Sequence, residues 1–373
     1  MSVLKSLRRW FKRPPSADIL FYAASWVDEV WIRSTILESH RRGCNVVLAV
    51  SGLAPALDIA RYQAMGVTVV SSIEPLALRS ISAPIAVTAS SGIPADWFDV
   101  GTRYRIHMPH SLVSLHMAYP VNAFDGYDVL FAAGPHHIAE FDALTRRRNL
   151  VGRQSRAIGY GKADVLPTQA TPRQTGRKPH VLLAPSWGPE SLLPRLGRTL
   201  TRELLKQDYQ VTLRAHPMQV ENQDPAYLEM LETLKEQDFK VESPTELPIS
   251  MNEADVFITD YSGTAFEYAL MRKRPILFVD VPRKVVNSAW QDLGLAPVEL
   301  RAREEIGVVV PALASACVDA AGRLLQDLAS WEGRIEAALP GFVFRPTSVA
   351  KAACDAIEGL GRHGTQPRAT VAL

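Results

Sequence analysis

Short apolar runs alternate with helix-like stretches along the chain from residue 18 onward. Each run has the length and composition of a strand that is buried on both faces, and the stretches between runs have the period of amphipathic helices. Parallel strands need such helical crossovers, which cover both faces of their sheet. The alternation therefore predicts an α/β protein with doubly wound, Rossmann-like parallel sheets. The predicted strands are 18–23, 45–50, 67–70, 84–88, 104–108, 127–132, 155–159, 180–184, 210–214, 255–259 and 275–279. The predicted helices include 27–41, 56–65, 135–148, 196–207, 226–237, 264–272 and 348–360.

One segment interrupts this alternation. Residues 167–179 are polar, contain prolines and have no period, which is typical of a linker between domains. Two α/β halves on either side of a linker predict two domains that face each other across a cleft. The predicted parts are a leader (1–15), a first domain (16–166), the linker (167–179), a second domain (180–340), a C-terminal helix (341–361) and a disordered tail (362–373).

The leader carries apolar side chains at helical spacing, with lysines and arginines on the other face, and Pro14 ends the pattern. No apolar core follows the charges, so it does not read as a secretory signal. A short basic amphipathic helix with Trp10 and Phe11 is suited to an anionic membrane surface, and equally to packing on its own domain. Both interpretations stay open.

The composition excludes several classes of protein. The formal net charge is +2 and charged residues make up 21% of the chain, which does not suggest a nucleic-acid-binding protein. The three cysteines are far apart, so neither a disulfide framework nor a zinc site is expected. No apolar run is long enough to span a membrane. We expect a cytoplasmic protein, with attachment to the inner face of the cell membrane as the alternative that the leader leaves open.

The stretch from Asp260 to Thr264 follows an apolar strand and precedes a helix. This order places Ser262, Gly263 and Thr264 at the amino end of that helix, where unpaired N–H groups and the helix dipole favour a phosphate. Glycine permits close approach of the backbone, and the two hydroxyls add donors. The alternative is an ordinary helix cap by Ser262 or Thr264.

Other strand ends carry polar side chains as well. Arg214 and His216 end one strand, just before a proline, and both side chains suit an anionic ligand. Ser186 and Trp187 end another strand, where a ligand contact and a simple turn are equally compatible with the pattern. Glu267 lies one turn into the helix after Thr264, where it can accept hydrogen bonds from a ribose or serve the helix dipole.

Three histidines lie close together in the first half: His107, His110 and His116. Their spacing lacks the cysteines or carboxylates of a metal site, and we predict no metal and no cofactor. A neutral histidine can instead take the proton of an acceptor hydroxyl, so His107 and His110 are candidate general bases. Loop packing and helix capping are the structural alternative.

Together these segments resemble the CDP-glycerol glycerophosphotransferases of the teichoic-acid and capsule type. The similarity lies in Thr259–Ser262 with Phe266–Leu270 and Arg274–Ile276, in the R-x-H-P piece 214–217 and in the strand end 184–187. Residues 127–131, 158–164 and 341–346 match further segments in the expected order. The resemblance spans about residues 100 to 360.

This resemblance implies a GT-B-like fold in which residues 180–340 bind the nucleotide donor and residues 16–166 bind the acceptor. It implies a metal-independent transferase, peripheral on the membrane, that uses CDP-glycerol as substrate and a lipid-linked or glycan acceptor in cell-envelope polymer synthesis. By position, the donor-binding residues are Ser186, Arg214, Asp260, Ser262, Gly263, Thr264 and Glu267, and the candidate catalytic residues are His110, His216 and His107.

The acceptor side departs from the family pattern. The family has H-G-T where this chain has His110-Ser111-Leu112, and His107 is an alternative match for the histidine. Two other functions therefore stay open. One is a glycosyltransferase of the same fold that uses a nucleotide sugar, and the other is a binding protein that kept the fold without the chemistry.

Overall fold

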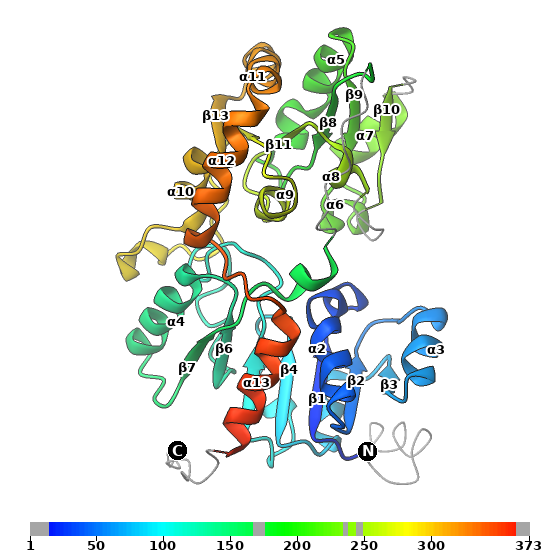
Figure 1. Ribbon diagram of the computed structural model, residues 1–373, viewed down its shortest axis with the longest axis vertical. Helices are drawn as coiled ribbons and strands as arrows, with labels where there is room; N and C mark the ends of the chain where they lie inside the picture. Colours follow the sequence, from blue (N-terminus) through cyan, green and yellow to red (C-terminus); the bar gives the residue numbers. More distant parts are fainter. Residues whose placement is uncertain (1–14, 167–175, 234–237, 244–248, 363–373) are drawn as a thin grey trace. The chain divides into compact units, whose positions relative to one another are not determined.

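The computed structural model describes residues 15–166, 176–233, 238–243 and 249–362 (Figure 1). The chain forms two compact units. Unit 1 comprises residues up to His110, then Asn122–Val165 and the stretch from Phe344, and unit 2 comprises Ser111–Val121 and Leu166–Val343. The predicted leader, most of the predicted linker and nearly all of the predicted tail lie outside the described residues.

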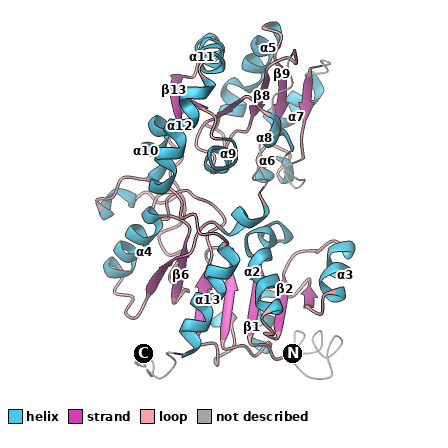
Figure 2. Cartoon of the chain, viewed as in Figure 1, coloured by secondary structure: helices cyan, strands magenta, loops and turns pink. Residues whose placement is uncertain are grey.

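Unit 1 contains a seven-stranded sheet in the order β3-β2-β1-β4-β5-β6-β7, and every pairing in it is parallel. Helices lie against this sheet (Figure 2). The central strands are buried throughout, as their uninterrupted apolar sequences predict. The strands are β1 (Ile19–Ala23), β2 (Val46–Val50), β3 (Thr68–Ser71), β4 (Ile85–Thr88), β5 (Tyr104–His107), β6 (Val129–Ala132) and β7 (Gln154–Ala157), and the helices are α2 (Glu29–Arg41), α3 (Ala56–Ala64), α4 (Pro135–Arg147) and α13 (Val349–Arg362).

Unit 2 contains a six-stranded sheet in the order β10-β9-β8-β11-β12-β13, again entirely parallel. Its strands are β8 (His180–Leu183), β9 (Gln210–Leu213), β10 (Phe239–Val241), β11 (Val256–Thr259), β12 (Ile276–Asp280) and β13 (Gly307–Pro311). Its helices are α5 (Arg198–Lys206), α6 (Pro217–Glu221), α7 (Pro225–Thr233), α8 (Ile249–Glu253), α9 (Thr264–Arg272), α10 (Val298–Glu305), α11 (Ala314–Gln326) and α12 (Leu328–Ala338).

The two sheets share one topological feature. In unit 1 the strand order reverses between β1 and β4, and in unit 2 it reverses between β8 and β11. At such a switch point the loops after the two strands run to opposite faces of the sheet and leave a crevice at the carboxyl ends, where ligands of open α/β sheets bind. The prediction of doubly wound parallel sheets is confirmed, and it fixes where a ligand is to be sought.

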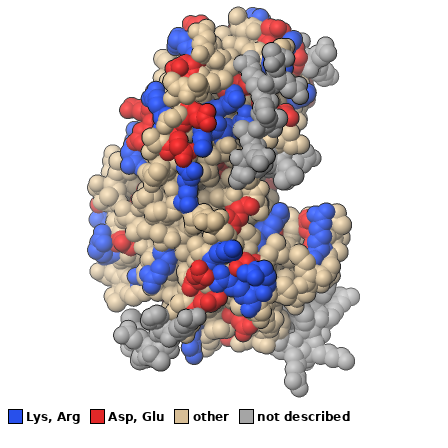
Figure 3. All heavy atoms as spheres, in the orientation of Figure 1, with Lys and Arg blue, Asp and Glu red and all other residues tan. Residues whose placement is uncertain are grey.

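Charged side chains of both signs share the face of the molecule that Figure 3 shows. On the face seen in Figure 3, lysines and arginines are intermixed with aspartates and glutamates, in keeping with the near-zero net charge of +2. No described helix is both long and apolar enough to cross a membrane.

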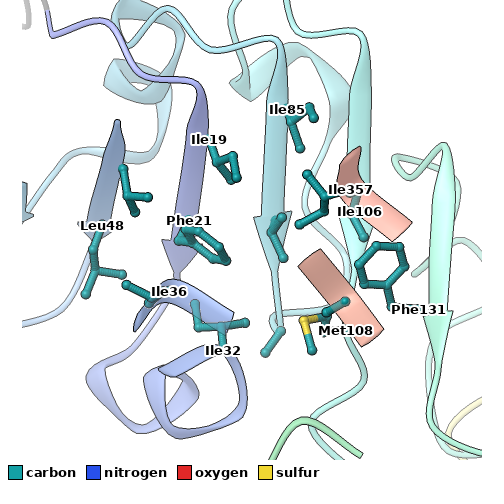
Figure 4. Close-up of a cluster of buried hydrophobic side chains, with 14 of the residues drawn as sticks. Ile19, Phe21, Ile32, Ile36, Leu48, Ile85, Ile106, Met108, Phe131 and Ile357 are labelled. Carbon is teal, nitrogen blue, oxygen red and sulfur yellow. The ribbon is translucent and has the colours of Figure 1, made fainter. Parts of the chain in front are cut away.

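The core of unit 1 contains side chains from early and from late in the sequence (Figure 4). Phe21, Ile106 and Phe131 of the sheet pack with Ile36 of α2 and with Ile357 of α13. The last helix therefore belongs to unit 1, whereas the sequence left it as a separate segment. Its first turn is capped by the Asp164 carboxylate, which accepts hydrogen bonds from the N–H groups of Val349 and Ala350 at 2.9 and 2.8 Å.

The segment 111–121 was predicted within the first domain, and the structure groups it with unit 2. Glu299 of α10 accepts hydrogen bonds from both the N–H and the hydroxyl of Ser114, each at 3.0 Å. The buried ring of His116 bonds to the Leu295 carbonyl at 3.1 Å, and Asn287 donates to the His116 carbonyl at 2.8 Å. His116 thus has structural partners, and no group of described His, Cys, Asp or Glu side chains is arranged to hold a metal ion.

His180 gives unit 2 a pH-dependent stability. Burial lowers the pKa of this histidine, at the start of β8, to about 4, and its Nε2 contacts the Thr212 hydroxyl at 2.8 Å. The unfolded pKa is about 6.5, so the unfolded chain binds the proton more readily than the folded one. The His180 contribution is therefore complete above pH about 6.5 and is lost as the pH falls from there toward about 4.

We expect acidification from pH 7 to pH 4.5 to destabilise wild-type unit 2 by about 2–3 kcal/mol through this group. His180→Gln, which cannot titrate, should show a flatter dependence of the unfolding free energy on pH over the same interval. Chemical denaturation at several pH values measures both slopes. Parallel slopes for wild type and variant would exclude His180 as the cause.

Candidate functional site

Asp260 connects the loops that follow β8 and β11, the two strands at the switch point of unit 2. It follows β11, it is fully buried, and its carboxylate accepts three backbone hydrogen bonds. Oδ1 accepts from the N–H groups of Ser186 and Tyr261, each at 2.7 Å, and Oδ2 accepts from the N–H of Leu192 at 2.7 Å. Asp260 therefore shapes the loop after β8, which carries Trp187. Its oxygens are engaged by the protein, which gives it a positioning role.

The amino end of α9 has no side-chain cap. Gly263 is the N-cap residue, and no cap side chain accepts a hydrogen bond from the first turn. The hydroxyls of Ser262 and Thr264 instead bond to each other at 2.8 Å. An uncapped helix start with two adjacent hydroxyls is suited to an anion. The alternative of a helix capped by Ser262 or Thr264 does not describe this geometry.

Gly263 is needed for close packing at the same point. A Cβ atom on Gly263 would collide with the Ser111 hydroxyl and press on Val113, both from the segment that joins unit 2 from the first half of the sequence. Ser111 therefore lies directly against the start of α9. The serine that replaces the family's glycine after His110 contacts the predicted phosphate site.

Arg214 and His216 both lie after β9, in different environments. The Arg214 guanidinium is nearly buried and donates to the Glu242 carboxylate at 2.6 Å and to the Ser243 carbonyl at 2.9 Å. Much of its charge is thus neutralised within the protein. Ser186 and Glu267 are also buried, Ser186 in the loop that Asp260 holds and Glu267 one turn into α9.

His216 is half-buried at the start of α6, where its Nδ1 accepts a hydrogen bond from the Met218 N–H at 3.1 Å. In the neutral ring the proton must then be on Nε2, so His216 is a hydrogen-bond donor through that nitrogen. A donor suits a phosphate oxygen, and it does not suit a general base. The ring lies 6.1 Å from that of Trp187.

A pocket of about 400 Å³ lies beside these residues in unit 2. Trp187, Gly188 and Pro189 form one side, and α6 and the start of α7 form the other. Its walls are mostly apolar, and its size falls in the range of small-molecule sites. The left-handed backbone of Gly188, with φ of +117°, lets the chain turn directly after Trp187.

Lys284 lies beside these residues and is not part of any of the sequence motifs. It follows β12, the strand next to β11, and its ammonium lies 3.9 Å from the centroid of the Trp187 ring. Burial lowers its pKa to about 8, and the Asp260 charge acts in the opposite direction. The sequence signal was weak, because Lys284 lies four residues beyond the strand end, outside any recognised motif.

His107 and His110 of unit 1 differ in their exposure to solvent. His107 is fully buried between Phe124 and Tyr127, and burial holds its pKa well below the usual value. His110 is half-buried, and its Nδ1 lies 2.9 Å from the Ala89 carbonyl at the end of β4. A carbonyl only accepts, so Nδ1 carries the proton and Nε2 of the neutral ring keeps its lone pair. This geometry favours His110 over His107 as a base.

Similarity to solved structures defines the fold. Among the solved structures that match almost the whole chain at low identity is a UDP-N-acetylglucosamine 2-epimerase, with a TM-score of 0.56 and 12% identity, covering 96% of this chain and 99% of that one. A Neisseria meningitidis UDP-GlcNAc 2-epimerase bound to UDP-GlcNAc has a TM-score of 0.55 and 10% identity, covering 92% of this chain and 99% of that one. Anabaena HepE in complex with UDP and glucose has a TM-score of 0.54 and 13% identity, with the same two coverages. The chain therefore has the GT-B fold.

A family model then matches part of the sequence. Residues 122–283 match the family model of CDP-Glycerol:Poly(glycerophosphate) glycerophosphotransferase, which confirms the predicted resemblance and the prediction of a transferase. The matched range contains Asp260–Thr264, Arg214 and His216, and it begins after His110. No curated protein matches the chain significantly.

Proposed function

We propose that this protein transfers glycerol phosphate, or a related alditol phosphate, from a CDP-activated donor to a hydroxyl of a lipid-linked or glycan acceptor. One observation carries the proposal. The uncapped start of α9, with Ser262 and Thr264 beside it, lies at the switch point of a sheet and inside the range that matches the glycerophosphotransferase family. The N–H groups of Ala265 and Phe266 donate to the Ser262 and Gly263 carbonyls, so this helix start offers a phosphate its dipole, the N–H groups before Ala265 and the two hydroxyls, without a metal.

In the proposed reaction, His110 Nε2 takes the proton of the acceptor hydroxyl. The resulting oxygen attacks the β-phosphorus of the donor, and the bond from that phosphorus to the bridging oxygen breaks. CMP leaves with that oxygen and its electron pair, and the alditol phosphate becomes esterified to the acceptor. Unit 2 stabilises the negative charge on the phosphates, with the start of α9 and His216 Nε2–H as the hydrogen-bond donors.

We further propose that the acceptor belongs to cell-envelope polymer synthesis, of the teichoic-acid or capsule kind, and that the protein acts on the inner face of the membrane. The predicted basic leader supports this location. Because the leader lies outside the described residues, its role is tested on the protein itself, by sedimentation with anionic vesicles with and without residues 1–13.

A donor screen tests the function. The purified protein is incubated with CDP-glycerol, CDP-ribitol or a UDP-, GDP- or CMP-sugar, together with lipid-linked and glycan acceptors, and the released nucleotide is measured. CMP release from a CDP-alditol that depends on the acceptor is the expected result. Turnover with a nucleotide sugar alone would replace the proposal by a glycosyltransferase, and absence of both turnover and nucleotide binding would indicate a non-catalytic protein.

His216 is expected to contribute at least about tenfold to turnover, since a lost donor to a phosphate costs on the order of 1–3 kcal/mol. His216→Ala removes both this donor and the α6 cap. His216→Asn is the matched control, because asparagine is an effective N-cap whose side chain is shorter than the histidine ring. We expect the asparagine variant to recover stability without recovering turnover. Normal turnover in both variants would remove His216 from the site.

A further inference from the structure

The loop after β12 places a lysine at the switch point of unit 2. The Lys284 ammonium lies over the face of the Trp187 ring at 3.9 Å, and Trp187 is in the loop that Asp260 holds. Within the described part of the chain, no carboxylate forms an ion pair with Lys284 and no acceptor forms a hydrogen bond with it. A cation–π contact attracts the ammonium but leaves its N–H groups without acceptors.

The carboxylate with the main electrostatic influence on Lys284 is Asp260. Both oxygens of that carboxylate already accept backbone N–H groups at 2.7 Å, so Asp260 does not serve as a direct partner. Lys284 is therefore a partly desolvated cation that is held in place by an aromatic ring and has no anionic partner among the described residues. Desolvating a charge is costly unless the charge is paired, and this cost is recovered when a ligand supplies the partner.

We propose that the Lys284 ammonium binds a phosphate of the nucleotide donor, with Trp187 as the platform that holds the lysine in position. This assignment rests on the proposed donor site in unit 2 and adds a recognition group that lies beyond the family match, which ends at residue 283. When the bond to the leaving nucleotide breaks, negative charge gathers on the phosphate of the leaving group, and an ammonium ion there stabilises it.

The proton on Lys284 supplies a distinctive readout. Since the pKa of the unliganded lysine is about 8, the ammonium form predominates at pH 7 and the neutral amine predominates above pH 9. Only the charged form attracts phosphate. The affinity for a nucleoside diphosphate should therefore fall as the pH rises through about 8, whereas an arginine at this position stays charged and should keep its affinity.

The test is equilibrium binding of CDP, UDP, CMP, cytidine and inorganic pyrophosphate to the full-length protein by calorimetry, at pH 7 and pH 9.5. For Lys284→Ala we expect CDP to bind at least tenfold more weakly at pH 7 and cytidine to bind as it does to wild type. For Lys284→Arg we expect affinity near that of wild type at pH 7 and no loss at pH 9.5. Arg283→Ala is the matched control, because it removes the same charge from the exposed neighbouring residue, and we expect less than a twofold change.

Several outcomes would overturn the proposal. Unchanged CDP affinity in Lys284→Ala, or equal weakening of CDP and cytidine, would show that Lys284 does not contact phosphate. An equal loss of CDP affinity in Arg283→Ala would show that the effect comes from the net positive charge and not from a contact made by Lys284. If UDP binds in place of CDP and Lys284→Ala weakens it, the lysine assignment stands while the CDP-alditol function fails. Binding of none of these ligands would overturn both.

Discussion

Replacing Asp260 by asparagine is expected to lower turnover by at least a hundredfold and to destabilise unit 2 by about 3 kcal/mol. Asparagine is the closest isostere, and it fails because of its own donors. All three bonds to Asp260 come from backbone N–H groups, to Oδ1 and to Oδ2. An amide NH₂ at either position would face an N–H, which leaves buried donors without acceptors.

The resulting change in melting temperature should be about 5–10 °C for a unit of this size. The loop from Ser186 to Leu192 would lose its anchor, so Trp187 and Lys284 would lose their positions together. Calorimetric unfolding and CDP titration measure the two effects.

Asp280→Asn is the matched control for Asp260. Asp280 ends the neighbouring strand β12, its side chain is 61% exposed, and it meets Arg303 at 3.3 Å. An exposed ion pair contributes little, so we expect a change within about 0.5 kcal/mol and normal turnover. If Asp260→Asn kept turnover within twofold of wild type, the positioning role of Asp260 would be refuted.

The position of Asp260 could be predicted, but its role could not. A buried-type strand followed by a helix start fixes Asp260 at a carboxyl end of the sheet from local sequence alone. The bond from Leu192 to Asp260 joins residues 68 positions apart, and no local pattern encodes which distant N–H groups a carboxylate will meet. The same limit applies to Arg214, whose pairing with Glu242 depends on β10 lying beside β9.

Elements with weak local signals were missed. β10 has only three residues, and two of them are exposed, so it has no apolar run to detect. The segment 111–121 shows why domain limits are hard to read: no polar or proline-rich stretch marks its move into unit 2, which rests on contacts such as Ser114 with Glu299. Among the longer elements, α9 and α4 were predicted to within a few residues, whereas α11, α12 and the apolar strand β13 were not among the predicted elements.

The choice between His107 and His110 shows a further limit. In a strand with one exposed face, polar and apolar residues alternate, and this alternation shows which side chains face water. β5 is covered on both faces, and its last three residues are all buried. His107 as the last residue of the strand therefore looked as accessible as His110 in the loop after it. Only the packing of Phe124 and Tyr127 around the His107 ring separates the two.

His110→Ala is expected to lower kcat by about 10²–10⁴-fold, the usual contribution of a general base. The KM for the nucleotide donor and the affinity for CDP should stay near wild-type values, because the proposed donor-binding residues belong to unit 2 and His110 belongs to unit 1. Single-turnover kinetics with saturating donor and acceptor measure the chemical step directly. A rise in the donor KM with unchanged kcat would contradict the role of base.

His107→Leu is the matched variant for His110→Ala. The His107 ring is fully buried among aromatic rings, and its nitrogens make only weak contacts with the backbone of Thr88 and Ser90, so an apolar side chain of similar volume should cost less than about 1.5 kcal/mol and leave turnover within twofold. The pair of variants decides between the histidines. Loss of turnover in a folded His107→Leu protein, with activity kept in His110→Ala, would transfer the base to His107. The expected result is the opposite: turnover is lost in His110→Ala and kept in His107→Leu. The Ala89 carbonyl then has a role in catalysis, because it holds the proton on His110 Nδ1, and only that tautomer presents a basic Nε2 to an acceptor hydroxyl.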